Sequence, residues 1–170
     1  MGLVRGVAAA TALLVCATPL LASSILPTPK EDLACRFRHP VQEVASFDAL
    51  PAPVRAFLTK RMADGPHDRY IIAARGADFQ NSDVIDPQTP PLWRRFIRAG
   101  HVGPVWFLWY EHTGITYVRM ATFVRLDLSR QAQLLAHVVY GDPGHRDPCV
   151  LTDAVVDGHL PPADLATEWW

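Results

Sequence analysis

The chain has 170 residues, with 16 Lys and Arg against 17 Asp and Glu and a formal net charge of −1. This balance argues against general electrostatic attraction to nucleic acid or to an anionic membrane surface. The length suits one domain with its own hydrophobic core, preceded by a short N-terminal segment.

Residues 1–24 have the pattern of a secretory signal peptide. Arg5 is their only charge, and a mostly apolar run is followed by small residues. Such a segment is removed on export, so we expect cleavage near Ala22 to Ser24, and an uncleaved anchor helix is the alternative. Residues 25–170 are then a single periplasmic or secreted domain without stable membrane insertion.

Two cysteines remain in that domain, Cys35 near its start and Cys149 near its end. In an oxidising compartment they predict one disulfide, and two unpaired buried thiols are the alternative. The loop-entropy model gives such a bridge on the order of 4–5 kcal/mol, which is an upper figure.

The first half of the domain predicts a helix, a strand and a loop. Apolar residues recur at helical spacing over residues 53–62, which predicts an amphipathic helix that rests on a sheet. Residues 69–74 predict a strand, and residues 75–91 predict a long polar loop. The acidic residues of this loop do not have the spacing of an EF-hand.

Residues 92–100 predict the strand before the most aromatic part of the chain. With a three-residue turn after it, Arg95 lies opposite Glu111 and forms an ion pair with it. Further along, residues 131–137 fit a helix or a strand, and we favour a strand over residues 134–140. Residues 150–157 predict one or two helical turns that follow Cys149.

The stretch over residues 105–126 predicts a β-hairpin that turns at Thr113-Gly114. A two-residue loop pairs His112 with Ile115 and separates two faces. The face predicted to be core carries Val105, Phe107, Trp109, Glu111, Thr116, Val118, Met120, Thr122, Val124 and Leu126. The other face mixes aromatic and cationic residues: Trp106, Leu108, Tyr110, His112, Ile115, Tyr117, Arg119, Ala121, Phe123 and Arg125.

The mixed face is the candidate partner-binding surface, because Tyr, Trp and Arg combine contact area with hydrogen-bonding ends. Its candidate contact residues are Trp106, Tyr110, His112, Tyr117, Arg119 and Arg125. A helix that covers this face is the alternative, since a sheet apolar on both faces is most often buried on both. A three-residue turn would shift the register by one and mix the two faces.

These elements predict an α+β fold in which an antiparallel meander of about four to five strands packs against one main helix, with a single disulfide. No catalytic motif is present, and no two of the seven histidines have the spacing of a shared metal face. We therefore expect no catalytic residue, metal or cofactor. The leading hypothesis is an exported, non-enzymatic binding domain with a protein partner in the cell envelope and no nucleic-acid ligand.

The segment Phe79-Gln80-Asn81-Ser82-Asp83, followed by two aromatic strands and His112, resembles the guanyl-specific bacterial ribonucleases over about 40 residues. The resemblance implies a helix packed on an antiparallel sheet. It departs from the family because residues 69–74 lack the glutamate base, and Val84 replaces the arginine after the motif. A small secreted hydrolase of ribonuclease type is therefore the alternative function.

Overall fold

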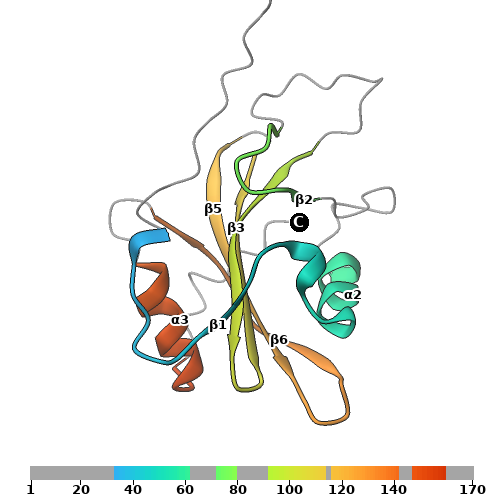
Figure 1. Ribbon diagram of the computed structural model, residues 1–170, viewed down its shortest axis with the longest axis vertical. Coiled ribbons are helices and arrows are strands. Elements are labelled where there is room, and N and C mark those ends of the chain that lie inside the picture. Colours follow the sequence, from blue (N-terminus) through green and yellow to red (C-terminus); the bar gives the residue numbers. More distant parts are fainter. Residues whose placement is uncertain (1–32, 62–71, 80–91, 114–115, 142–146, 160–170) are drawn as a thin grey trace, which may run out of the picture.

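The computed structural model describes residues 33–61, 72–79, 92–113, 116–141 and 147–159 (Figure 1). The predicted signal peptide with its cleavage site and most of the predicted 75–91 loop lie outside these residues. The described part has an α+β architecture, with one largely antiparallel sheet and helices on its two sides. The predicted fold class is therefore confirmed in outline.

Six strands form the sheet, in the order β1-β3-β4-β5-β6 with β2 added beside β3. Their bounds are β1 Gln42–Val44, β2 Ile72–Ala73, β3 Arg94–Val102, β4 Val105–His112, β5 Val118–Leu126 and β6 Ala132–Tyr140. The strands from β3 to β6 form the predicted meander, and the ambiguous stretch before Tyr140 is a strand. Strand β2 lies within the strand predicted over residues 69–74, and the sheet has more strands than predicted because the three-residue β1 is too short to leave a clear pattern in the sequence.

The predicted register of the β4–β5 hairpin is wrong. His112 pairs with Val118 instead of Ile115, and Val105 pairs with Arg125. The pairing is displaced by three residues, because residues 113–117 all belong to the connection. Side chains alternate along a strand, so an odd displacement exchanges the two faces of β5 relative to β4.

The corrected register makes both faces of the sheet apolar and buried. One cluster of buried residues comprises Ile97, Val105, Phe107, Trp109, Ala121, Phe123, Ala136, Val138, Tyr140, Cys149, Leu151 and Val155. The cluster on the other face comprises Leu50, Val54, Leu58, Phe96, Ala99, Leu108, Tyr110, Met120 and Val124. The predicted open aromatic face is therefore covered core, as the alternative interpretation had it.

Two helices provide this cover, whereas the sequence predicted one main helix and only one or two helical turns over residues 150–157. Helix α2 (Ala52–Arg61) places Val54 and Leu58 against one face, and helix α3 (Pro148–Val156) places Leu151 and Val155 against the other. Figure 1 shows α2 and α3 on opposite sides of the sheet. A short 3-10 helix, η1 (Phe47–Ala49), precedes α2.

The β3–β4 turn also differs from the prediction, although the predicted pair forms. Val102 pairs with Val105, so the loop is the two residues Gly103-Pro104, with Gly103 at φ +54° as a type II′ turn requires. A bulge between Phe96 and Arg98 then shifts the register by one. The bulge brings Arg95 opposite Glu111, as a three-residue turn would have done.

The predicted disulfide is present between Cys35 and Cys149, which are 114 residues apart in sequence. Cys149 is the second residue of α3 and is fully buried, whereas Cys35 is partly exposed. The bridge therefore fastens the segment before β1 to the start of α3.

Candidate binding site

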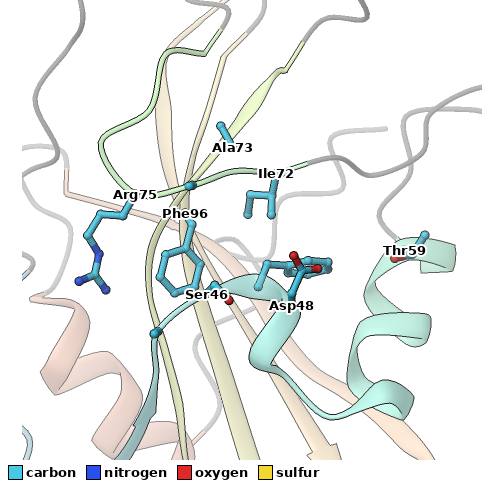
Figure 2. A pocket seen from close by; sticks show the side chains of 10 residues that line it. Ser46, Asp48, Thr59, Ile72, Ala73, Arg75 and Phe96 are labelled. Carbon is cyan, nitrogen blue, oxygen red and sulfur yellow. The ribbon is translucent and has the colours of Figure 1, made fainter.

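A pocket lies where the outer edge of β3 changes its partner strand. Strand β1 pairs with β3 at residues 99–101, and β2 pairs with it at residues 94–95. Between these two pairings a cavity of about 380 Å³ opens toward η1 and α2 (Figure 2). Its lining consists of Ala45, Ser46, Phe47, Asp48, Thr59, Ile72, Ala73, Ala74, Arg75 and Phe96.

The pocket combines an apolar floor with a polar rim. Phe96, which is buried, and the half-buried Ile72 form the floor, and the exposed Asp48 and Thr59 stand on the rim. Figure 2 shows Asp48 and Ser46 on η1 and its N-terminal side, facing the strand that carries Ile72. An apolar cavity with a few polar groups at its mouth is the usual composition of a ligand site, and its volume is within the usual range.

Arg75 bounds the pocket on the other side of Phe96. Its Nε donates a 2.7 Å hydrogen bond to the carbonyl oxygen of Ile97, the residue at the β3 bulge. Its guanidinium carbon lies 5.4 Å from the centre of the Phe96 ring. The bulge leaves a carbonyl for a side chain to bind, and Arg75 uses it to hold the chain after β2 against β3.

The six predicted partner-binding residues do not share one surface. Trp106, Tyr110 and His112 lie on the α2 face of the sheet, Arg119 and Arg125 lie on the α3 face, and Tyr117 belongs to the β4–β5 connection. Tyr110 is only 2% exposed, while Tyr117 is 43% exposed and Arg125 is also exposed. The grouping was wrong because it depended on the hairpin register, and a partner-binding role of the exposed members stays a prediction.

A buried charge cluster lies on the α3 face at the end of β4. The side chains of Arg95 and Glu111 are fully buried and joined by two hydrogen bonds, of 2.5 and 2.8 Å. The hydroxyl of Tyr117 donates a 2.7 Å hydrogen bond to Glu111, and Arg119 occupies the position opposite Glu111 on β5. Burial, and then the hydrogen bond to Glu111, raise the pKa of Tyr117 well above its usual value.

The same register correction explains how Arg119 is used. Its Nη2 donates a 2.7 Å hydrogen bond to the carbonyl oxygen of Gly141, and its guanidinium carbon lies 5.6 Å from the centre of the Tyr140 ring. These contacts, together with the Arg95–Glu111 pair, connect β3, β4, β5 and the end of β6. The cluster therefore stabilises the sheet by holding these strands together.

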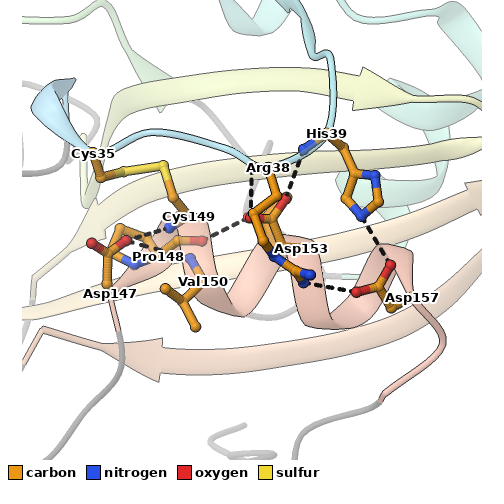
Figure 3. Close-up of polar contacts among 10 residues, drawn as sticks. Cys35, Arg38, His39, Asp147, Pro148, Cys149, Val150, Asp153 and Asp157 are labelled. Carbon is orange, nitrogen blue, oxygen red and sulfur yellow. Dashed lines mark hydrogen bonds and ion pairs between the residues drawn. A yellow bond between two sulfur atoms is a disulfide. The ribbon is translucent and has the colours of Figure 1, made fainter.

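A second polar cluster joins the segment after Cys35 to α3 (Figure 3). The buried carboxylate of Asp153 accepts hydrogen bonds from the backbone N–H groups of Arg38 (2.9 Å) and His39 (3.4 Å). One turn later, Asp157 accepts a 2.7 Å hydrogen bond from the Arg38 guanidinium and lies 2.9 Å from the His39 ring. The Arg38 hydrogen bond lowers the pKa of Asp157, and the His39 hydrogen bond adds to this effect. Burial opposes them, but the pKa stays below its usual value.

One group of potential metal ligands occurs among the described residues. Atoms of Cys35, Asp147 and Cys149 lie within 4.8 Å of one another. Both sulfurs belong to the disulfide, so neither is a thiolate that could bind a metal in this oxidised form. Asp147 instead caps α3, because its carboxylate accepts hydrogen bonds from the N–H groups of Cys149 and Val150.

The residues that resemble the guanyl-specific ribonucleases are only partly described. Phe79 lies beneath the Arg95 guanidinium, 4.3 Å from it, and residues 80–83 lie outside the described part. His112 faces the α2 side of the sheet, whereas Glu111 faces the α3 side and binds Arg95. The prediction that Glu111 and His112 point in opposite directions is confirmed, and the two side chains cannot act on one substrate.

No protein-family model, curated protein or solved structure matches this chain. Within the described residues, no helix combines the length and the apolar character that a membrane span requires.

Sequence reasoning missed the pocket residues Ser46, Asp48, Thr59 and Arg75. None of them belongs to a motif, and they come together only because β1 and β2 share the edge of β3. One signal was available in the small side chains of Ala73 and Ala74, which leave space beside a predicted strand. A signal of that kind indicates room for a ligand and does not identify it.

Proposed function

We propose that this chain is an exported, non-enzymatic binding domain and that it holds a segment of a partner protein in the pocket beside Phe96. Export is an expectation from the pattern of residues 1–24, and the Cys35–Cys149 disulfide is compatible with an oxidising compartment. The observation that carries the proposal is the cavity at the interrupted edge of β3.

An extended segment of a partner suits this pocket because short strands form two of its walls. The chain around Ala45 follows β1, and the chain around Ala74 follows β2, so both walls present main chain as well as side chains. A bound segment can insert one side chain over Phe96 while its peptide groups meet these walls. Main-chain contacts of this kind contribute affinity, and the pocket contributes selectivity.

The charges at the pocket favour a partner segment with both hydrogen-bond donors and acceptors. Asp48 and Arg75 stand on opposite sides of Phe96, and both are exposed. Arg75 uses its Nε for the Ile97 carbonyl, so its terminal nitrogens extend beyond that bond. A peptide carries N–H and C=O groups at regular spacing. It can therefore donate a hydrogen bond to Asp48 on one side of the pocket and accept one from Arg75 on the other.

The test is capture of proteins from an envelope extract by the purified mature domain, with a variant that fills the pocket. Ala45→Trp places a large ring at an exposed lining position, and Ala56→Trp places the same ring at an exposed position of α2 outside the lining. Both variants should keep the wild-type melting temperature. We expect Ala56→Trp to capture the same protein as the wild type and Ala45→Trp to lose at least tenfold of that affinity, about 1.4 kcal/mol.

Equal capture by Ala45→Trp and the wild type would contradict the proposed site. The purified wild-type domain should also be assayed for degradation of RNA and of peptidoglycan. Turnover of either substrate would contradict the non-enzymatic part of the proposal and favour the ribonuclease-like or another hydrolytic alternative.

A further inference from the structure

The two sulfurs of the disulfide have different surroundings. Cys149 is 0% exposed and packs in the core cluster with Ile97 and Leu151, whereas Cys35 packs against that cluster from outside and is partly exposed. A thiol that attacks a disulfide must reach one sulfur and displace the other. Access from solvent therefore favours attack on the sulfur of Cys35.

A buried cation contacts both sulfurs. Nη1 of Arg98 lies 3.9 Å from the Sγ atom of Cys35 and 3.9 Å from that of Cys149. Rings of Phe37 and Trp109 lie 4.6 and 5.5 Å from the guanidinium carbon, and the other terminal nitrogen binds Glu43 at 2.5 Å. These contacts fix the guanidinium where a thiolate forms when the disulfide opens.

Among the described residues, Glu43, Asp147 and the dipole of helix α3 also contribute charge near the sulfurs. Glu43 is bound to Arg98 and reduces its effect, and Asp147 lies within 4.8 Å of the sulfurs but is exposed and accepts two backbone N–H groups. Arg98 is only 9% exposed, so its charge is less screened by water than that of Asp147. Cys149 also lies in the first turn of the nine-residue helix α3, where the helix dipole favours a negative charge.

We propose that Cys35 is a thiol-exchange site and that Cys149 is its buried resolving partner. A thiolate from outside attacks Sγ of Cys35, forming a new S–S bond to that sulfur as the Cys35–Cys149 bond breaks. The bonding electron pair leaves on Sγ of Cys149, which becomes a thiolate beside Arg98. In the reverse step this thiolate attacks Sγ of Cys35, restores the intramolecular disulfide and expels the external thiolate.

This exchange would leave most of the fold in place. The segment after Cys35 stays attached to α3 through Asp153, which accepts from the backbone of Arg38 and His39. The mixed disulfide would therefore form on a folded protein, and Cys149 would stay close enough to reverse it. The site fits a low-molecular-weight thiol or a thiol of another exported protein.

The experiment treats the native, oxidised mature chain with increasing concentrations of reduced glutathione, followed by acid quenching and peptide mapping by mass spectrometry. We expect the glutathione adduct on Cys35, a free thiol at Cys149, and an initial rate that rises linearly with glutathione concentration. An adduct mainly on Cys149, or equal amounts on both, would overturn the proposal. So would a rate that saturates at the unfolding rate of the protein, since exchange would then need the unfolded chain.

Two variants test the part played by Arg98. Arg98→Met removes the cation, and Arg98→Lys keeps a positive charge at the same position. A neighbouring cation lowers the pKa of the leaving thiol and so speeds its departure. We therefore expect Arg98→Met to react with glutathione about tenfold more slowly than the wild type, and the rate of Arg98→Lys to be closer to the wild-type rate. An Arg98→Met rate equal to that of the wild type would overturn the assigned role of Arg98. Adduct mapping on the wild type decides the attacked sulfur even where a variant is unstable.

Discussion

Arg95 and Glu111 face each other on neighbouring strands, with both side chains fully buried and two hydrogen bonds between them. Two charges in the core are tolerated because each neutralises the other and because Tyr117 adds a further hydrogen bond to the carboxylate. The pair connects β3 to β4 beside the β3 bulge. Its contribution can be measured by removing one charge and then both.

Glu111→Gln should lower the free energy of unfolding by about 3–5 kcal/mol, because it leaves the Arg95 guanidinium buried without a counter-charge. Chemical denaturation monitored by tryptophan fluorescence gives this value directly. The double variant Arg95→Met with Glu111→Leu serves as the control, since it removes both charges and fills a similar volume. We expect the double variant to be more stable than Glu111→Gln. The opposite order would show that the unpaired charge of Arg95 is not what destabilises Glu111→Gln.

The raised pKa of Tyr117 predicts that the protein loses stability at alkaline pH. Its pKa is raised by burial and then by the hydrogen bond to Glu111, so the folded state holds the phenol proton more tightly than the unfolded state. Its contribution is complete below the unfolded pKa of about 10, and is lost as pH rises through the folded pKa. We expect the free energy of unfolding to fall above about pH 10, and Tyr117→Phe to remove part of this fall. Ultraviolet titration of the wild type and of Tyr117→Phe should assign to Tyr117 a phenol that ionises above its usual range.

Much of the sheet could be predicted from local pattern. The strands from β3 to β6 and helix α2 lie close to their predicted positions, and the disulfide was predicted from two cysteines in a domain expected to be exported. Arg95 and Glu111 were also predicted to pair, although the bulge that aligns them was not visible in the sequence. The spacing of apolar residues locates these strands and this helix, because alternation and helical periodicity are local properties of the sequence.

The hairpin faces could not be predicted, because they depend on the length of one connection. Thr113-Gly114 has the composition of a two-residue turn, and the β-prone residues after it suggested that the next strand begins at Ile115. The strand begins at Val118 instead. The pocket was missed for a similar reason, since it depends on where two short strands meet the edge of β3.

Gly100 on β3 provides a test of the close approach of β1. A Cβ atom at this position would lie 2.7 Å from the carbonyl oxygen of Gln42, a backbone atom of the paired strand. Gly100→Ala must therefore push β1 away from β3, and we expect it to lower the free energy of unfolding by about 1–3 kcal/mol. Hydrogen exchange should show faster amide exchange in residues 42–44. Unchanged stability together with unchanged exchange would contradict the close pairing of the two strands.

Asp153 and Asp157 form a matched pair for testing how the segment after Cys35 is held on α3. Both carboxylates bind this segment from one side of the helix, but Asp153 is buried and Asp157 is exposed (Figure 3).

The two oxygens of Asp153 accept from different backbone N–H groups, those of Arg38 and His39, so Asp153→Asn places an N–H₂ group against one of these two donors. Loss of a hydrogen bond to this buried, charged acceptor should cost about 1–3 kcal/mol. Asp157→Asn makes the same chemical change at an exposed ion pair, where screening by water reduces the loss.

The pH dependence separates these two carboxylates further. The pKa of Asp157 is lowered first by its hydrogen bond from Arg38, so its contribution is present above the unfolded pKa and is lost as pH falls through the folded pKa. Denaturation of the wild type and both variants across the acid range measures this. We expect Asp157→Asn to flatten the acid limb slightly while changing stability little at neutral pH, and Asp153→Asn to be destabilised at neutral pH. Equal loss in the two variants at neutral pH would mean that burial does not determine which carboxylate holds the segment.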